Sequence, residues 1–482
     1  MKRFLNIATA VVVAVLIAAP GYAARGEADF TTFVALGDSY GAGFESGSLN
    51  ERHQVWSWPA VVARQAGLSL CLPGATAAAT CFAQPLVSFP GISNELVLNS
   101  LVPSPVIAPA PGQGQPLMLN FARPYNNLSI PGATVGALLS LTGAEPQTPN
   151  EPTAVSFARF ILRGQGTPVQ QASALHPTFI ALWIGGNDYL NVIFSGNPAT
   201  MTSATDFAAR YEALITALVT ANPNAGMVVG NLPSSIPPYL TLVPPYIVNP
   251  ATGQPVLDPA GNRIYYVGTN PDGSFGQLAP TTLIPLQTRA RLAQGYGIPP
   301  ALAGFPPFNQ LPFAGTPLSA DDVITADEIA QVVARVGQYN AAINQIAAAR
   351  DIPVADIAGL FQRVSHGMQL GPVAISAAPV TGGFFNLDFF HLTDLGYLLF
   401  GNEFIKAINT AYGTQIPVAS IAQLFMNNGA FFGDSGPGVG NHLTFTGSNS
   451  GITDDAVSGI VSFWSRQPIP RRLGGRNRVV NH

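Results

Sequence analysis

Four short, uninterrupted apolar runs constrain the fold of this chain more than any other feature. They show little alternation between apolar and polar residues. Runs of this kind are typical of strands that are buried on both faces of a parallel sheet. The four runs are Thr31–Leu36, Thr178–Ile184, Gly226–Gly230 and Ile352–Ile357, and a weaker fifth is Asn127–Ile130.

Helical patterns lie between and after these runs. Ala204–Ala221 and Ala326–Ala349 carry apolar residues at spacings of three and four, as in amphipathic helices. A third helix is expected over Leu395–Tyr412, with Thr393 as its N-cap and Gly413 as its C-terminal stop. Strands that alternate with helices predict an α/β fold, a parallel sheet of about five strands covered by helices.

Two stretches rich in proline and glycine interrupt this rhythm, near residues 84–125 and 233–318. Long irregular segments within a domain are usually functional or disordered. Because both stretches also contain many aromatic and aliphatic residues, we expect ordered insertions. Whether they cap a substrate site or only pack against the body stays open at this point.

The N-terminus has the pattern of a secretory signal. A basic start precedes an apolar run that Pro20 and Gly21 end before it reaches the length of a membrane span, and small residues follow. We therefore expect residues 1–23 to be a cleaved signal peptide, with an uncleaved anchor as the less favoured alternative. The mature protein would be exported, either to a periplasm or out of the cell.

The two cysteines fit an exported protein. Cys71 and Cys81 lie close together in the sequence, and a loop disulfide is the favoured interpretation over two free thiols. The six histidines are scattered and none stands at metal-ligand spacing, so no metal site is expected.

Charge is sparse and nearly balanced, with 21 basic and 25 acidic residues. A chain without a basic field is not expected to bind nucleic acid. Residues 418–482 form a tail rich in Gly, Ser and Asn that ends in several arginines. We favour a solvated, poorly ordered tail, and weak contact with an anionic envelope surface is the alternative.

Ser39 lies at the end of the first apolar run, in GDSYGAG. This position is the carboxyl edge of the predicted sheet, where α/β folds build their sites. A serine hydroxyl acts as a nucleophile only with a base to take its proton and a group that orients the base. His391 and Asp388, three residues apart in DFFHLT, are the candidates for these two roles.

Acyl transfer also requires donors for the oxyanion. Gly132, in NLSIPGAT, is able to bring its backbone N–H close because it has no side chain. Asn187, in IGGND, follows a strand and two glycines, which would direct its amide over the sheet edge. Taken alone, Gly132 is also compatible with a simple turn and Asn187 with a helix cap.

The segments GDSY, NLSIPGAT, IGGND and DFFHLT resemble, in this order, the sequence blocks of the GDSL or SGNH hydrolases. The resemblance spans residues 30–415 and implies a flavodoxin-like three-layer α/β/α sandwich, here within a hydrolase domain over residues 24–417. It implies that Ser39 is the nucleophile, His391 the base and Asp388 its partner, and that Ser39, Gly132 and Asn187 are the oxyanion donors. It further implies that no metal or organic cofactor is needed.

The resemblance predicts a secreted serine ester hydrolase of the lipase or esterase type, acting on a small-molecule or lipid ester. Tyr40 and Leu392 depart from the residues common in the family, and neither change touches a catalytic atom. A carbohydrate O-deacetylase and a non-catalytic lipid- or glycan-binding protein remain the alternatives. A second Gly-Asp-Ser, at Ser435, is interpreted as part of a loop. The natural ester, the acyl length and the oligomeric state stay open.

Overall fold

The computed structural model describes residues 25–426 except 77–79, 101–105, 250–251, 270–273 and 372. The expected signal peptide, Ser435 and the arginines of the tail lie outside the described residues. Among the described helices, none combines the length and the apolar character that crossing a bilayer requires.

The centre of the molecule is a parallel four-stranded sheet, as the apolar runs predict. Its strand order is β1-β4-β5-β8, and every neighbouring pair is parallel. The strands are β1 (Phe33–Gly37), β4 (Phe179–Trp183), β5 (Gly226–Gly230) and β8 (Val354–Ala355).

The expected fifth strand is reduced to a single bridge beside β1. Asn127 pairs with Ala35 in the parallel sense, and the backbone N–H groups of Leu128 and Ile130 donate to the carbonyls of Ala35 and Gly37. The segment therefore lies where a fifth strand would lie, with too few pairs to form one.

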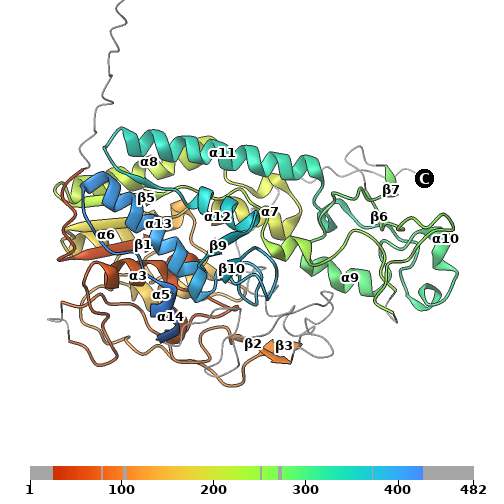
Figure 1. Ribbon diagram of the computed structural model, residues 1–482, viewed down its shortest axis with the longest axis horizontal. Coiled ribbons are helices and arrows are strands. Elements are labelled where there is room, and N and C mark those ends of the chain that lie inside the picture. Colours follow the sequence, from red (N-terminus) through yellow and green to blue (C-terminus); the bar gives the residue numbers. More distant parts are fainter. Residues whose placement is uncertain are drawn as a thin grey trace, which may run out of the picture.

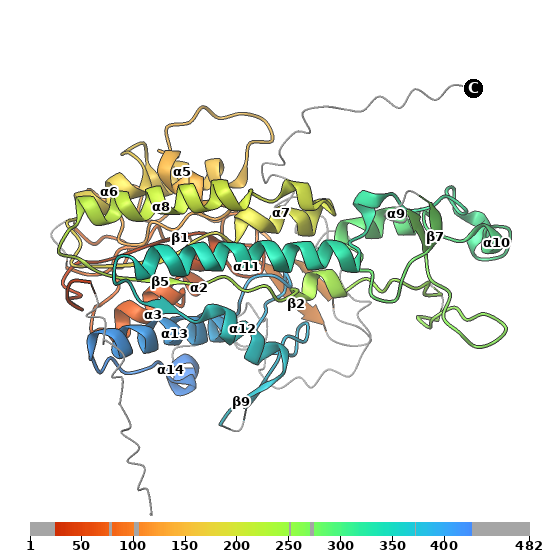
Figure 2. The same ribbon diagram turned by 90° about the horizontal axis from the view of Figure 1, so that it is seen from above.

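Helices cover both faces of the sheet and make the predicted three-layer sandwich. Figure 2 shows the sheet between one layer that contains α6 and α8 and another that contains α3 and α13. The first layer comprises α4 (Val135–Ser140), α6 (Pro168–Ala174), α8 (Ala204–Ala221) and α11 (Ala326–Ala348). The second comprises α3 (Trp58–Gln65), α12 (Ile357–Ser365), α13 (Asp394–Tyr412) and α14 (Ile421–Met426).

The predicted helix ends are confirmed at α13. The Thr393 side chain accepts a hydrogen bond from the Gly396 N–H, and Gly413 ends the helix in the left-handed region with φ 68°. Only glycine adopts this conformation without strain, so the chain stops the helix there. Further helices of the body are α1 (Ser39–Ala42), α2 (Glu51–Gln54), α5 (Thr153–Leu162) and α7 (Asn187–Ser195).

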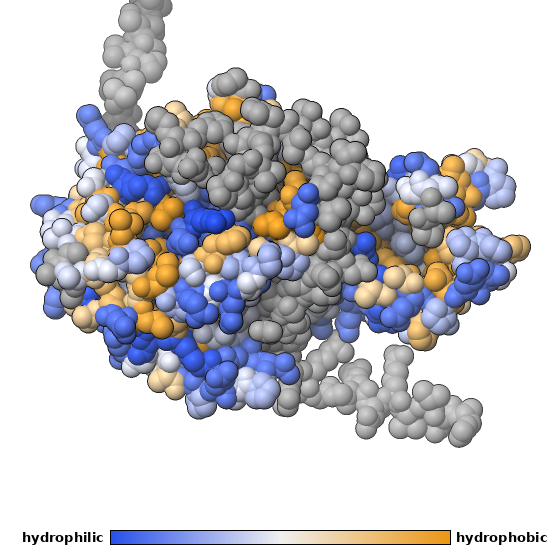
Figure 3. All heavy atoms as spheres, turned by 90° about the horizontal axis from the view of Figure 1, so that it is seen from below, coloured by the Kyte–Doolittle hydropathy of each residue, from blue (hydrophilic) through white to orange (hydrophobic). Residues whose placement is uncertain are grey.

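The second Pro/Gly-rich stretch projects from the body at one end (Figure 1). It contains β6 (Val267–Thr269), β7 (Phe275–Gln277), α9 (Arg289–Ala293) and α10 (Pro300–Ala303). It has a small core of its own, made by residues such as Ile284 and Leu318, yet Phe275 and Phe305 are about two-thirds exposed. Figure 3 shows hydrophobic side chains among the polar ones on the surface of this projection.

The first Pro/Gly-rich stretch carries an antiparallel hairpin, β2 (Leu96–Ser100) and β3 (Val106–Pro109). It covers the body on the side opposite α8 and α11 in Figure 1. A further small hairpin, β9 (Met368–Leu370) with β10 (Val373–Ile375), follows α12.

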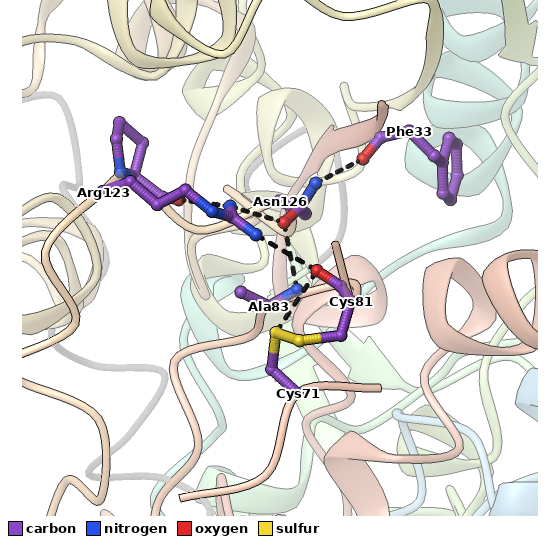
Figure 4. The surroundings of a disulfide bond; sticks show 7 residues. Phe33, Cys71, Cys81, Ala83, Arg123 and Asn126 are labelled. Atoms are coloured by element: carbon purple, nitrogen blue, oxygen red, sulfur yellow. Dashed lines mark hydrogen bonds between the residues drawn. A yellow bond between two sulfur atoms is a disulfide. The ribbon is translucent and has the colours of Figure 1, made fainter. Parts of the chain in front are cut away.

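The predicted disulfide between Cys71 and Cys81 is present, with 5.0 Å between the two Cα atoms. Figure 4 shows the side chain of Arg123 beside it. Arg123 Nη2 donates to the Cys81 carbonyl at 3.1 Å, and Arg123 Nη1 donates to Asn126 Oδ1 at 2.8 Å. Asn126 in turn donates to the carbonyl of Phe33 at 2.8 Å, so the disulfide loop is tied to β1.

Candidate active site

Ser39 is positioned by the sharp passage from β1 into α1. The buried strand ends at Gly37, and Asp38 caps the helix by accepting a hydrogen bond from the Tyr40 N–H at 3.0 Å. Ser39 is the first residue of the helix and is only 3% exposed. The predicted nucleophile therefore lies at the carboxyl edge of the sheet, in a site that is largely closed to bulk water.

His391 and Asp388 form a buried pair on the loop before α13. His391 Nδ1 lies 2.7 Å from Asp388 Oδ2, and the His391 side chain is fully buried. Burial alone would raise the pKa of Asp388, but the attraction of His391 and hydrogen bonds from His391 and Phe390 outweigh it and lower this pKa below its usual value. Asp388 therefore stays ionised at neutral pH and orients the imidazole.

The loop that carries this pair is held by its own backbone. Asp388 Oδ1 accepts hydrogen bonds from the N–H groups of Phe390 at 2.9 Å and His391 at 2.7 Å. Phe389 has φ 63°, a conformation that non-glycine residues rarely adopt. Strained residues of this kind persist where the surroundings enforce them, and they cluster at functional sites.

Three contacts join the His391 loop to the segment that follows Ser39. The Tyr40 hydroxyl donates to the Phe390 carbonyl at 2.8 Å, and the rings of Tyr40 and His391 lie 5.6 Å apart. The Gly47 N–H donates to Asp388 Oδ2 at 3.0 Å. The structure thus brings together two segments that are about 350 residues apart in the chain.

Asn187 begins α7 directly after β4 and points to the same edge. Its Nδ2 donates to the Ala133 carbonyl at 2.9 Å and makes only a long contact, 3.4 Å, with Asp38 Oδ2. Gly132, beside Ala133, has φ 81° and so occupies a backbone conformation suited to glycine. The Ala133 carbonyl therefore fixes one hydrogen of the Asn187 amide, while the other hydrogen makes only the long contact with Asp38.

Asp38 is a site residue that the sequence analysis did not single out, although it precedes Ser39 directly in GDSY. Burial raises the pKa of Asp38 to about 8; the Tyr40 N–H opposes this shift and the nearby Asp188 carboxyl adds to it. At neutral pH Asp38 is therefore mostly uncharged. An uncharged neighbour does not repel the negative charge that would develop in an oxyanion beside Ser39.

A narrow pocket of about 30 Å³ opens beside Ser39 and Asn187. Aromatic side chains make up much of its wall, and the lining residues come from segments at or after the ends of all four strands and from the His391 loop. The apolar side chains in the wall include Tyr40, Trp183, Leu190, Phe361, Phe385 and Phe390. The sequence analysis missed this lining, since aromatic residues in separate segments carry no motif.

Comparisons with solved structures found distant likenesses. LAE5, an alpha/beta hydrolase enzyme from the metagenome of Lake Arreo, Spain, is 12% identical, with 81% of this chain and 99% of that chain covered and a TM-score of 0.32. A family 3 carbohydrate esterase of Clostridium thermocellum is 14% identical, with 78% and 93% covered and a TM-score of 0.29. Phospholipase A1 of Streptomyces albidoflavus NA297 is 14% identical, with 80% and 100% covered and a TM-score of 0.30.

A search of curated proteins found no match. The family model of the GDSL-like lipases and acylhydrolases, in contrast, matches residues 33–404. This range contains the central sheet, the Ser39 turn and the His391 loop. The chain therefore belongs to the GDSL-like lipase/acylhydrolase family.

Proposed function

We propose that this protein hydrolyses carboxylic acyl esters by two-step acyl transfer through Ser39. The observation that carries the proposal is the buried His391–Asp388 pair, 2.7 Å between Nδ1 and Oδ2, on a loop packed against the helix that begins with Ser39. A carboxylate on Nδ1 directs the other nitrogen of the ring to act as a base. Membership of an acylhydrolase family agrees with this chemistry.

In the first step, Ser39 Oγ attacks the ester carbonyl carbon while His391 Nε2 takes the hydroxyl proton. Asp388 stabilises the imidazolium that forms and keeps its own charge, because its pKa is lowered. The proton then passes to the leaving alcohol, and an acyl group remains bound to Ser39. In the second step a water molecule, deprotonated by the same histidine, attacks this acyl-enzyme and releases the acid.

The negative oxygen of each tetrahedral intermediate would be held by three donors: the N–H groups of Ser39 and Gly132 and the amide of Asn187. The contact from Asn187 to the Ala133 carbonyl fixes the amide plane before the substrate arrives. The weakly held second hydrogen is then available to the oxyanion. Preorganised donors of this kind need little reorganisation during the reaction.

The aromatic wall of the pocket favours an apolar acyl group, and its small volume favours a short one. We therefore infer short acyl esters of lipids or small alcohols as the substrate class, because an aromatic wall suits an apolar alcohol better than the hydroxyl-rich ring of an acetylated sugar.

The test is hydrolysis of a p-nitrophenyl ester series, from acetyl to long acyl chains, with an acetylated sugar alongside. We expect the highest kcat/KM with short acyl esters, loss of activity in Ser39→Ala, and full activity in Ser435→Ala, the matched control in the second Gly-Asp-Ser. A preference for the acetylated sugar would favour a carbohydrate O-deacetylase. Folded protein that is inert on every ester would favour a non-catalytic lipid- or glycan-binding protein.

We also infer that the protein is exported. The disulfide fits an oxidising compartment, since such bonds are rare where cellular reductants keep thiols reduced. The basic and then apolar N-terminus fits a cleaved signal. Mass spectrometry of the N-terminal peptide in the periplasmic fraction and the culture medium tests this, and an intact Met1 on protein kept inside the cell would refute it.

A further inference from the structure

A second buried histidine lies close to the His391 loop, among three carboxylates. His53, on α2, is surrounded by Glu45, Glu95 and Asp394, which come from three other segments of the chain. All four side chains are at most 4% exposed. Buried charges are rare unless they are paired or bind a metal, so the arrangement calls for a physical explanation.

The side chains of Glu45, His53 and Asp394 converge on one point. His53 Nδ1 lies 3.1 Å from Asp394 Oδ1 and 3.3 Å from Glu45 Oε2, and the ligand atoms all lie within 4.8 Å of one another. Oxygen and nitrogen ligands bound about 2.1 Å from a small divalent cation are spaced about 3.0–3.4 Å apart. The two spacings from His53 Nδ1 fall within that range.

Among these residues, Glu45 is the one whose burial is not explained by hydrogen bonds. Its side chain is fully buried, no described residue donates a well-aligned hydrogen bond to it, and its own contacts are His53 Nδ1, 3.3 Å from Oε2, and the carboxyl of Asp394. His53 Nδ1 offers at most one N–H, which already faces Asp394 at 3.1 Å. A buried carboxylate without a donor is costly, on the order of several kcal/mol, and a cation would remove that cost.

The other edge of the imidazole is held as in known metal sites. Glu95 Oε1 lies 3.1 Å from His53 Nε2, and Asn50 Nδ2 donates to Glu95 Oε2 at 2.9 Å. A carboxylate on the far nitrogen of a metal-binding histidine fixes the ring and makes it a better ligand. Here it directs Nδ1 toward Glu45 and Asp394.

We propose that Glu45, His53 and Asp394 bind one divalent cation of the zinc type through two carboxylate oxygens and one imidazole nitrogen. The imidazole favours zinc or a related transition metal over Ca²⁺ and Mg²⁺, which prefer oxygen ligands alone. The sequence analysis expected no metal because these residues come from distant segments, so they show no ligand spacing in the chain.

The position of this site gives the cation a structural role. Asp394 is the first residue of α13, three residues after His391, and Glu45 is two residues before Gly47, whose N–H donates to Asp388. A cation bound to Glu45 and Asp394 would therefore clamp together the two segments that hold Asp388 in place. Its removal should loosen this region and lower the stability of the whole domain.

The test uses untagged full-length protein, stripped of metal with EDTA and then dialysed. We expect calorimetric titration with Zn²⁺ to give one ion per chain, with an unfolding temperature raised by several degrees. Co²⁺ should give the visible absorption of a metal bound to nitrogen and oxygen. Binding should weaken at least tenfold in Glu45→Gln and Asp394→Asn, and stay unchanged in Glu212→Gln, whose carboxylate pairs with Arg350 at the surface.

Wild-type protein that binds neither Zn²⁺ nor Co²⁺ at one equivalent would overturn the proposal. Binding of Ca²⁺ in preference to Zn²⁺, or zinc binding that persists in both variants, would overturn it as well. If either variant does not fold, the wild-type titration and the Co²⁺ spectrum still decide. None of these measurements requires ester hydrolysis, so their failure leaves the proposed function untouched.

Discussion

His391 and His53 are both buried histidines with a carboxylate close to Nδ1, yet their surroundings differ. His391 faces one carboxylate, Asp388, on Nδ1, while its loop packs against the helix of Ser39. His53 faces carboxylates on both nitrogens, with Asp394 and Glu45 at Nδ1 and Glu95 at Nε2.

This difference distinguishes a histidine suited to catalysis from one suited to a structural role. A histidine acts as a general base only if one nitrogen is directed at the proton that it takes, while the other is oriented by a partner. Asp388 orients Nδ1 of His391, as the condition requires of one nitrogen, and our proposal assigns Nε2 to the Ser39 proton. The environment of His53 engages both nitrogens with acidic groups, which suits a metal ligand or a buried ionic network rather than a base.

The strongest test of this comparison exchanges each histidine for glutamine. His391→Gln should lower kcat by roughly 10³- to 10⁶-fold, as expected for loss of the base in a triad. His53→Gln should instead act mainly on stability, with a loss of about 3–5 kcal/mol, because it breaks a buried ionic group. Steady-state kinetics and urea unfolding of both variants measure the two effects. A large loss of kcat in His53→Gln, with a loss of stability alone in His391→Gln, would contradict the comparison.

Removal of the carboxylate that serves His391 tests the orienting role. Asp388→Ala should lower kcat by roughly 10²- to 10⁴-fold, because the imidazole loses its fixed orientation and the partner of its positive charge. Asp356→Ala is a matched control, since Asp356 caps α12 through the Gly359 N–H and accepts a hydrogen bond from Asn231. Full activity in Asp388→Ala would mean that Ser39 and His391 suffice as a dyad.

The Asn187→Ala variant tests one of the proposed oxyanion donors. We expect kcat to fall roughly 10²- to 10³-fold with little change in fold, as for loss of one such donor elsewhere. Asn222→Ala removes another buried amide, at the C-cap of α8, and should leave kcat unchanged. An unaltered kcat in Asn187→Ala would remove Asn187 from the site.

The last prediction concerns Asp38, the carboxyl beside Ser39, and bears on stability and not on kcat. Its pKa is about 8 in the folded protein, against an ordinary value of 3.8. Between these two values the folded state holds a proton that the unfolded state releases. Wild-type stability should therefore fall as pH rises through this window, by at most about 1.4 kcal/mol per pH unit.

Asp38→Asn should abolish that contribution, because an amide does not titrate and is still able to cap α1. Denaturant unfolding at pH 5 and pH 8, on both proteins, measures the difference. If the two proteins lose stability in parallel, Asp38 is not held neutral beside Ser39.

Much of the fold was predictable because its strands are buried on both faces. The runs at 33–37, 179–183 and 226–230 are apolar throughout, so they differ clearly from the amphipathic helices between them. The segment at Asn127 was harder, since one bridge to Ala35 replaces the expected strand. The sequence shows that a segment is apolar, but it does not show how many backbone pairs the segment will form with the neighbouring strand.

The candidate site was predictable to the extent that it consists of short motifs. Ser39, Gly132, Asn187 and His391 each lie in a segment with glycines or polar residues at the end of a strand or before a helix. The aromatic pocket and the His53 cluster were not predictable. Their members come from segments far apart in the chain, and only tertiary packing brings them together.

The most direct test of the central claim is covalent trapping of the nucleophile with a fluorophosphonate, followed by peptide mass spectrometry. Our account predicts one adduct, on Ser39, that disappears in Ser39→Ala and forms much more slowly in His391→Gln. An adduct on Ser435, or active protein that forms no adduct on Ser39, would contradict it.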